Sequence, residues 1–103
     1  MIDKYMPCLI RATSTLQTLD TAMISTPVER FDQARKILNC ELVQWVPLPS
    51  FDDGGWSLLI DEEGKLKPHR LNNVATRIAI NDIDRSDYIA GDAILIRISD
   101  FAT

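Results

Sequence analysis

The sequence contains few of the residues that nucleophilic catalysis and metal binding require. Its 103 residues include one histidine and two cysteines. Nucleophilic catalysis needs a nucleophile beside a base and an orienting group, and small zinc sites use closely spaced pairs of cysteine and histidine. Cys8, Cys40 and His69 lie far apart in the sequence and form no such pair. We therefore predict no metal site, no cofactor and no catalytic residue. A pairing of either cysteine with His69 stays open as the enzymatic alternative.

Glycine is also scarce, and its distribution argues against the common phosphate and calcium loops. None of the four glycines belongs to a G-x-G-x-x-G or G-x-x-x-x-G-K pattern. The acidic run that starts at Asp82 places carboxylates at the first and third positions of a calcium loop. Asp87, however, occupies the sixth position, where that loop needs glycine. The sequence thus offers neither a phosphate cradle nor a calcium site.

Long apolar runs and an excess of basic charge are both missing. The longest apolar runs are tetrads such as residues 93–96, far shorter than the roughly 20 residues of a membrane-spanning helix. The start of the chain, MIDKYMPCLI, lacks the basic, apolar and small-residue regions of a signal peptide. The formal net charge of −4 gives no general attraction to nucleic acid or anionic membranes. We predict a cytoplasmic protein with free thiols at Cys8 and Cys40 and with no membrane or nucleic-acid partner.

The overall composition is ordinary for one folded domain. Hydrophobic residues make up 46% of the chain and charged residues 25%, as in typical globular proteins. The length fits a single domain covering residues 1–103. The pattern of elements predicts a compact α+β domain of order β-β-α-β-β-α-β. Its sheet is expected to be mainly antiparallel, with one main helix packed on it.

Two helices are predicted, and the first has the clearest signals. The sequence Thr-Pro-Val-Glu at 26–29 combines a capping box with proline at the first helical position. Apolar residues then recur at helical spacing, and Asn39 fits a left-handed residue at the helix end. The second, shorter helix covers residues 73–80, and Asn72 or Asn73 is expected to cap it.

Five strands are predicted from apolar runs between turn signals. Pro47 cannot donate a hydrogen bond to a sheet, so its strand ends there or lies at an edge. Trp45 and Trp56 are expected to face the core, or each other across a hairpin. The predicted strands cover residues 6–12, 18–25, 41–48, 56–61 and 92–99.

The stretch LLIDEEGKLKPHRLNNVAT, residues 58–76, concentrates charged side chains. Its adjacent carboxylates at 61–63 could raise one another's pKa by like-charge repulsion. We interpret them instead as a solvated turn after a strand, with Gly64 as its left-handed residue. His69 is interpreted as a solvated loop residue. A site is therefore expected in the connection 67–73 rather than at the carboxylates.

The same stretch, together with the later YIAGDAILI, resembles a domain of unknown function carried by many bacteriophages and plasmids. In that family an apolar strand runs into Asp-Glu-Glu-Gly-Lys-Leu. An asparagine with a nearby small pair follows, and then Ile-x-Gly-Asp or Ile-x-Gly-Thr before another apolar strand. The segment ILNCELVQWVPL is also similar to the family's helix leading into a strand. The resemblance spans roughly residues 28–98 and implies a mobile-element setting rather than a mechanism. The matching positions are Asp61 to Leu66, Asn72 or Asn73, Ala75, Thr76, Ile89, Gly91 and Asp92.

We therefore predict a small non-enzymatic accessory protein of a phage or other mobile element. It would bind a host protein or assemble with itself in the host cytoplasm, an expectation that rests on association rather than on a visible site. The alternative is a binder of a nucleotide-like small molecule, in which Arg70, Asn72 and Arg77 meet an anionic ligand near a helix N-terminus. The candidate contact residues are Lys65, Lys67, His69, Arg70, Asn72 and Asn73, with Arg77 for the alternative.

Overall fold

The chain is built around a five-stranded sheet in which every neighbouring pair of strands is antiparallel. The computed structural model describes residues 8–13, 16–18, 27–52 and 54–97. The strand order is β2-β1-β5-β4-β3, so the last strand of the chain lies between the two hairpins. The strands are β1 (Cys8–Ile10), β2 (Leu16–Thr18), β3 (Val43–Leu48), β4 (Trp56–Asp61) and β5 (Ala93–Arg97).

The order of elements confirms the predicted α+β fold of order β-β-α-β-β-α-β. Helix α1 spans Pro27–Leu38, helix α2 spans Asn73–Ala79, and a short 3₁₀ helix, Gly64–Leu66, lies between β4 and α2. The second strand begins at Leu16, before its predicted start at residue 18, because β1 turns back so that Ile10 lies opposite Leu16. Residues 6–7, 19–25 and 98–99 of the predicted strands lie outside the described part of the chain.

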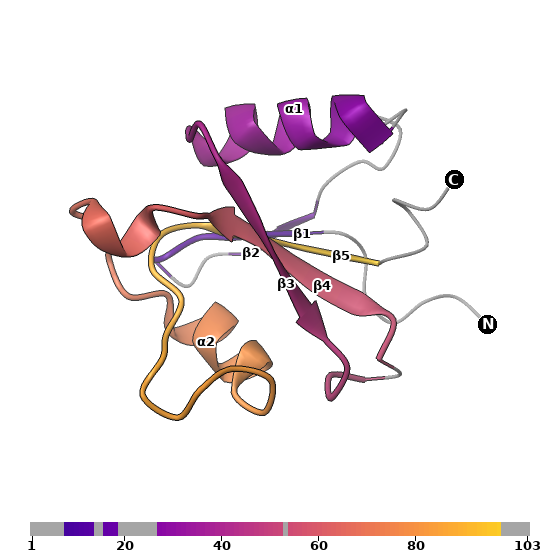
Figure 1. Ribbon diagram of the computed structural model, residues 1–103, viewed down its shortest axis with the longest axis vertical. Helices are drawn as coiled ribbons and strands as arrows, with labels where there is room; N and C mark the ends of the chain where they lie inside the picture. Colours follow the sequence, from indigo (N-terminus) through magenta and orange to yellow (C-terminus); the bar gives the residue numbers. More distant parts are fainter. Residues whose placement is uncertain (1–7, 14–15, 19–26, 53, 98–103) are drawn as a thin grey trace.

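The two helices cover opposite faces of the sheet (Figure 1). Ala34 and Leu38 of α1 pack on one face, and Ala75 and Ala79 of α2 pack on the other. The expectation of one main packed helix therefore describes only half of the arrangement. Among the described residues, no helix is long and apolar enough to cross a membrane.

Strand β4 is buried along its whole length because both of its faces are covered. Trp56 is 0% exposed and joins the cluster beneath α2, with Leu58 and Ile60. Trp45 of β3 is half-buried on the α1 side, where its indole Nε1 donates to the Ser57 hydroxyl at 2.6 Å. The prediction that the tryptophans face the core is confirmed for Trp56, and the two rings lie on opposite faces rather than against each other.

Several element boundaries follow the local signals that predicted them. Asn39 has a φ of 52° directly after α1, and the Cys40 N–H donates to the Arg35 carbonyl across this turn, which closes the helix end. Strand β3, which contains Pro47, lies at an edge of the sheet, where a missing donor is tolerated. Trp56–Asp61 has the predicted bounds, and it forms the expected long hairpin with β3.

Candidate functional site

Asp61 is the buried centre of the connection between β4 and α2. It ends β4 and is 4% exposed. Its Oδ1 accepts the Glu63 backbone N–H at 2.9 Å, and its Oδ2 accepts the Lys67 ammonium at 2.7 Å. His69 Nε2 lies 3.3 Å from the same Oδ2. The prediction that Asp61 belongs to a solvated turn is therefore wrong, because the connection folds back over the carboxylate.

These contacts decide the charge of the Asp61 carboxyl. Burial by itself would raise the pKa of Asp61, but hydrogen bonds from Lys67, the Glu63 N–H and His69 favour the ionised form. The net pKa of Asp61 lies below its ordinary value. In return, the hydrogen bond to Asp61 raises the pKa of Lys67. Asp61 and Lys67 thus form an ion pair. A carboxyl group with a lowered pKa differs from the protonated carboxylic acid with a raised pKa that general acid catalysis uses.

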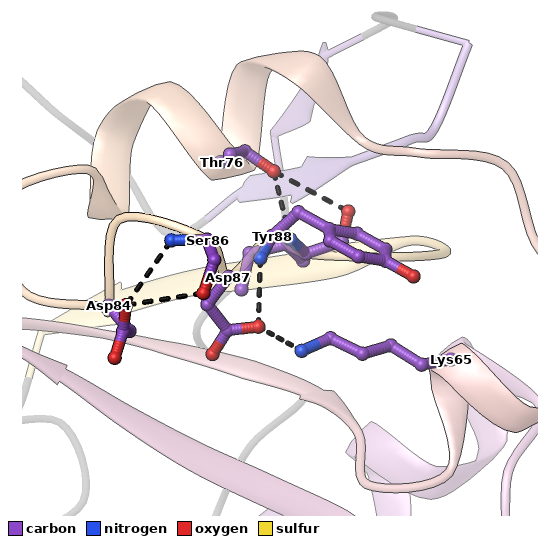
Figure 2. Close-up of polar contacts among 7 residues, drawn as sticks. Lys65, Thr76, Asp84, Ser86, Asp87 and Tyr88 are labelled. Atoms are coloured by element: carbon purple, nitrogen blue, oxygen red, sulfur yellow. Dashed lines mark hydrogen bonds and ion pairs between the residues drawn. The ribbon is translucent and has the colours of Figure 1, made fainter.

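A second ion pair links the 3₁₀ helix to the loop before β5 (Figure 2). Lys65 reaches the carboxylate of Asp87, and its ammonium lies 4.8 Å from the centre of the Tyr88 ring. Asp87 also accepts the Tyr88 backbone N–H at 2.8 Å. The hydrogen bond from Lys65 is the main reason why the pKa of Asp87 is lowered. Thr76 holds the next residue of the loop, since its hydroxyl accepts the Ile89 N–H at 2.9 Å.

Asn72 holds the connection to the sheet from the inside. It is 0% exposed, its amide donates to the carbonyls of Ile10 and Gly91 at 2.9 Å each, and its side-chain oxygen accepts the Ala75 N–H as the cap of α2. The prediction of an asparagine cap is confirmed for Asn72. Its proposed role as a contact residue is corrected, because a fully buried and fully hydrogen-bonded amide is not accessible to a partner.

Two glycines of the signature segment allow the backbone and the ring of His69 to approach closely. A Cβ on Gly64 would lie 2.8 Å from the Ala90 carbonyl oxygen, so a larger residue cannot fit there without a shift. Gly91 has a φ of +84°, and a Cβ on it would lie 3.1 Å from the His69 ring. Gly64 therefore serves a close contact, whereas Gly91 is the residue in the left-handed region.

The remaining candidate residues fall into two groups on the surface. Arg70 is exposed, and its carbonyl accepts the Gly91 N–H, next to the bridge between Leu71 and Ala90. Asn73 and Arg77 instead line a groove beside the β3–β4 loop. We call the solvent-facing side of the β4–α2 connection, together with Tyr88 that contacts it, the connection surface. It consists of Lys65, Leu66, Lys67, His69, Arg70, Leu71 and Tyr88.

Exposed apolar side chains are the part of the connection surface that the sequence did not predict. Leu66 is 84% exposed, Leu71 48% and Tyr88 41%. In a stretch that mixes apolar and polar residues, the sequence alone does not show whether a leucine side chain is buried or exposed. For Tyr88, the contact with Lys65 joins residues from two different loops that are far apart in the sequence. The helical periodicity that reveals a buried stripe does not exist in this irregular connection.

The cysteines do not form a pair in this fold. Cys8 packs against the cluster on the α2 face, whereas Cys40 packs against the cluster on the α1 face. Both are free thiols, and burial raises the pKa of each, helped at Cys40 by the Asp61 carboxylate. A thiol with a raised pKa is mostly protonated at neutral pH and is a weak nucleophile. Among the described residues, no group of three or more His, Cys, Asp or Glu side chains could hold a metal ion.

A polar groove of about 770 Å³ lies between the end of α1 and the turn after β4. Its cations, Arg35, Lys36 and Lys67, are matched by carboxylates. Arg35 pairs with Asp32, and Lys67 pairs with Asp61. Because its charges are already balanced, this groove favours neither anions nor cations.

Comparisons with known proteins assign no family to the chain. No protein-family model matches it, and searches of curated proteins and of solved structures give no significant match.

Proposed function

We propose that this protein is a non-enzymatic accessory protein of a bacteriophage or other mobile element that binds a protein partner through the connection surface. The partner would be a host protein in the host cytoplasm or a second copy of the chain. The observation that supports this proposal is the combination of exposed Leu66 and Leu71 with basic groups on one structured connection, joined by exposed Tyr88 from the loop before β5, whose ring contacts Lys65. Protein interfaces are typically built from apolar and aromatic side chains within a polar rim.

The rigidity of the connection supports binding by a preformed surface. Asp61 holds Lys67 and His69 from beneath, and Asn72 ties the segment to β1 and to the residues before β5. A surface fixed in this way loses little conformational entropy when it binds. Leu66 is presented on it at 84% exposure, so its apolar side chain is available for contact with a partner.

The charges of the connection surface favour a protein partner over nucleic acid. Lys65 and Lys67 are both neutralised by carboxylates, Asp87 and Asp61. Among the described residues no carboxylate pairs with Arg70, which leaves one unmatched guanidinium. Binding to a phosphate backbone draws its affinity from several cations that each release counterions. One guanidinium beside exposed leucines is better suited to an interface with a carboxylate and an apolar patch.

The experiment compares two double variants that leave the buried contacts intact. Leu66→Ser with Arg70→Ser removes one exposed apolar group and one guanidinium from the connection surface. Ile80→Ser with Arg85→Ser is the matched control, since Ile80 is 60% exposed and Arg85 is exposed outside this surface. Lys67 is left unchanged because its loss would strand the Asp61 carboxylate.

We expect the first variant to capture at least tenfold less partner from a bacterial lysate, as measured by quantitative mass spectrometry, since an interface hot spot contributes about 2 kcal/mol or more. The control variant should capture as much as the wild type, and both should melt at the wild-type temperature. Sedimentation of the purified protein separates a host partner from self-assembly. Equal capture by the two variants would remove the connection surface from the proposal.

A further inference from the structure

A second groove lies away from the connection surface, between α2 and the loop that joins β3 to β4. Its volume is about 530 Å³, within the range of about 300–1,000 Å³ that small-molecule sites occupy. Residues from the loop form one wall, and residues from α2 and the turn after it form the other. The groove is lined by Ser50, Phe51, Asp52, Asn73, Val74, Arg77, Ile78 and Asn81.

The loop wall is held in place by contacts with residues outside the groove. The Ser50 N–H lies 3.3 Å from both carboxylate oxygens of Asp82, which follows α2, so the loop is tied to the end of the helix. The Phe51 ring packs edge-to-face on the buried Trp56 ring, with 6.3 Å between centroids. A groove whose walls are fixed to the core is largely formed before a ligand arrives.

The lining combines an apolar floor with opposite charges on the two walls. Phe51, Val74 and Ile78 are partly buried against the core and supply the apolar surface. Arg77 lies on α2, and no ion pair joins it to another described residue. The Asp52 carboxylate comes from the loop wall. A complementary ligand therefore needs an apolar body, an anionic group for the guanidinium and N–H donors for the carboxylate.

We propose that this groove binds a small purine nucleotide with the chemistry of guanosine monophosphate. The planar base would lie on the floor made by Phe51, Val74 and Ile78. The adjacent ring and amino N–H groups of guanine would donate to Asp52, and the phosphate would meet Arg77. Asn73 is placed four residues before Arg77 on α2, on the same side of the helix, where its amide reaches the same ligand. Adenine lacks this pair of adjacent donors. The site is independent of the protein-binding surface proposed above.

The test measures binding of guanosine monophosphate to the full chain by isothermal titration calorimetry, with guanosine, adenosine monophosphate and inorganic phosphate as further probes. Arg77→Gln removes the guanidinium, and Arg85→Gln is its matched control because Arg85 is exposed and does not line the groove. Asp52→Asn keeps a residue that tolerates the positive φ of 52° at this position while removing the carboxylate. Melting temperatures of the unliganded variants check that each one folds.

We expect guanosine monophosphate to bind the wild type more tightly than the other probes. Arg77→Gln should weaken this binding roughly tenfold or more, as loss of a charge-assisted pair does, and should leave guanosine binding unchanged. Asp52→Asn should abolish the preference over adenosine monophosphate. Absence of binding at millimolar concentration, or equal losses in Arg77→Gln and Arg85→Gln, would overturn the proposal. Loss of protein capture in Arg77→Gln without nucleotide binding would do the same, because it would assign the groove to a peptide.

Discussion

Two lysines of one short connection form ion pairs in very different surroundings. Lys65 meets the Asp87 side chain, which is 37% exposed, whereas Lys67 meets the Asp61 side chain, which is 4% exposed. The two pairs share their chemistry, and their lysines lie two positions apart in the sequence. Their environments differ because β4 ends beneath the connection, while Asp87 lies in the loop before β5. Burial of the acceptor, rather than the presence of a pair, decides how much each contact contributes to the fold.

The buried carboxylate also organises more of the chain than the exposed one. Asp61 collects Lys67, the Glu63 backbone and His69 within hydrogen-bond distance. An exposed pair is screened by water and gains about 0–1 kcal/mol. A buried acceptor whose loss leaves donors without partners costs more when it is removed than it gained in forming. The shape of the connection surface should therefore depend on Asp61.

Asp61→Ala is expected to have the largest effect. It leaves the Glu63 N–H without its acceptor in the partly buried turn and releases Lys67 and His69, so the free energy of unfolding should fall by about 2–3 kcal/mol. Urea denaturation followed by tryptophan fluorescence measures this, because Trp56 is buried. Asp87→Ala is the control, with an expected loss below about 1 kcal/mol. Equal losses would mean that burial does not separate the two pairs.

Acid should remove part of the same stabilisation. The folded-state pKa of Asp61 lies below its ordinary value of about 3.9, so ionised Asp61 stabilises the fold fully above that value. The contribution is lost as the pH falls from about 4 through the folded-state pKa. The difference in unfolding free energy between wild type and Asp61→Asn should thus shrink as the pH falls below about 4. A difference that grows on acidification would contradict the lowered pKa.

Local sequence signals predicted most of the fold. The left-handed Asn39, the cap at Asn72 and the strand Trp56–Asp61 all depend on a few neighbouring residues. The covering of both sheet faces was missed, although the three successive apolar residues 58–60 of β4 are the kind of run that burial on both faces produces. The start of β2 was predicted too late because no clean alternation marked either face of its predicted segment.

The candidate site was only partly predictable from sequence. The basic residues of the connection all lie within residues 65–70, so sequence alone grouped them. The burial of Asp61 could not be predicted from its immediate neighbours in the sequence. It results from the folding back of Lys67 and His69, which lie six and eight residues further on. Asn73 and Arg77 were separated from Arg70 because α2 turns them towards the β3–β4 loop. Tertiary placement of this kind has no signature in composition or periodicity.

The exposed pair provides the smallest and most discriminating prediction. A double-mutant cycle of Lys65→Ala and Asp87→Ala should give a coupling free energy of about 0.5 kcal/mol, because both side chains remain hydrated. At about 1 M salt, where the screening length is roughly 3 Å, this coupling should nearly vanish. A Tyr88→Leu background tests the cation–π contact of Lys65 separately, since it removes the aromatic face and keeps an apolar side chain. A coupling above about 1 kcal/mol that persists in high salt would show that Lys65 and Asp87 behave as a buried pair, and the contrast with Asp61 would then not hold.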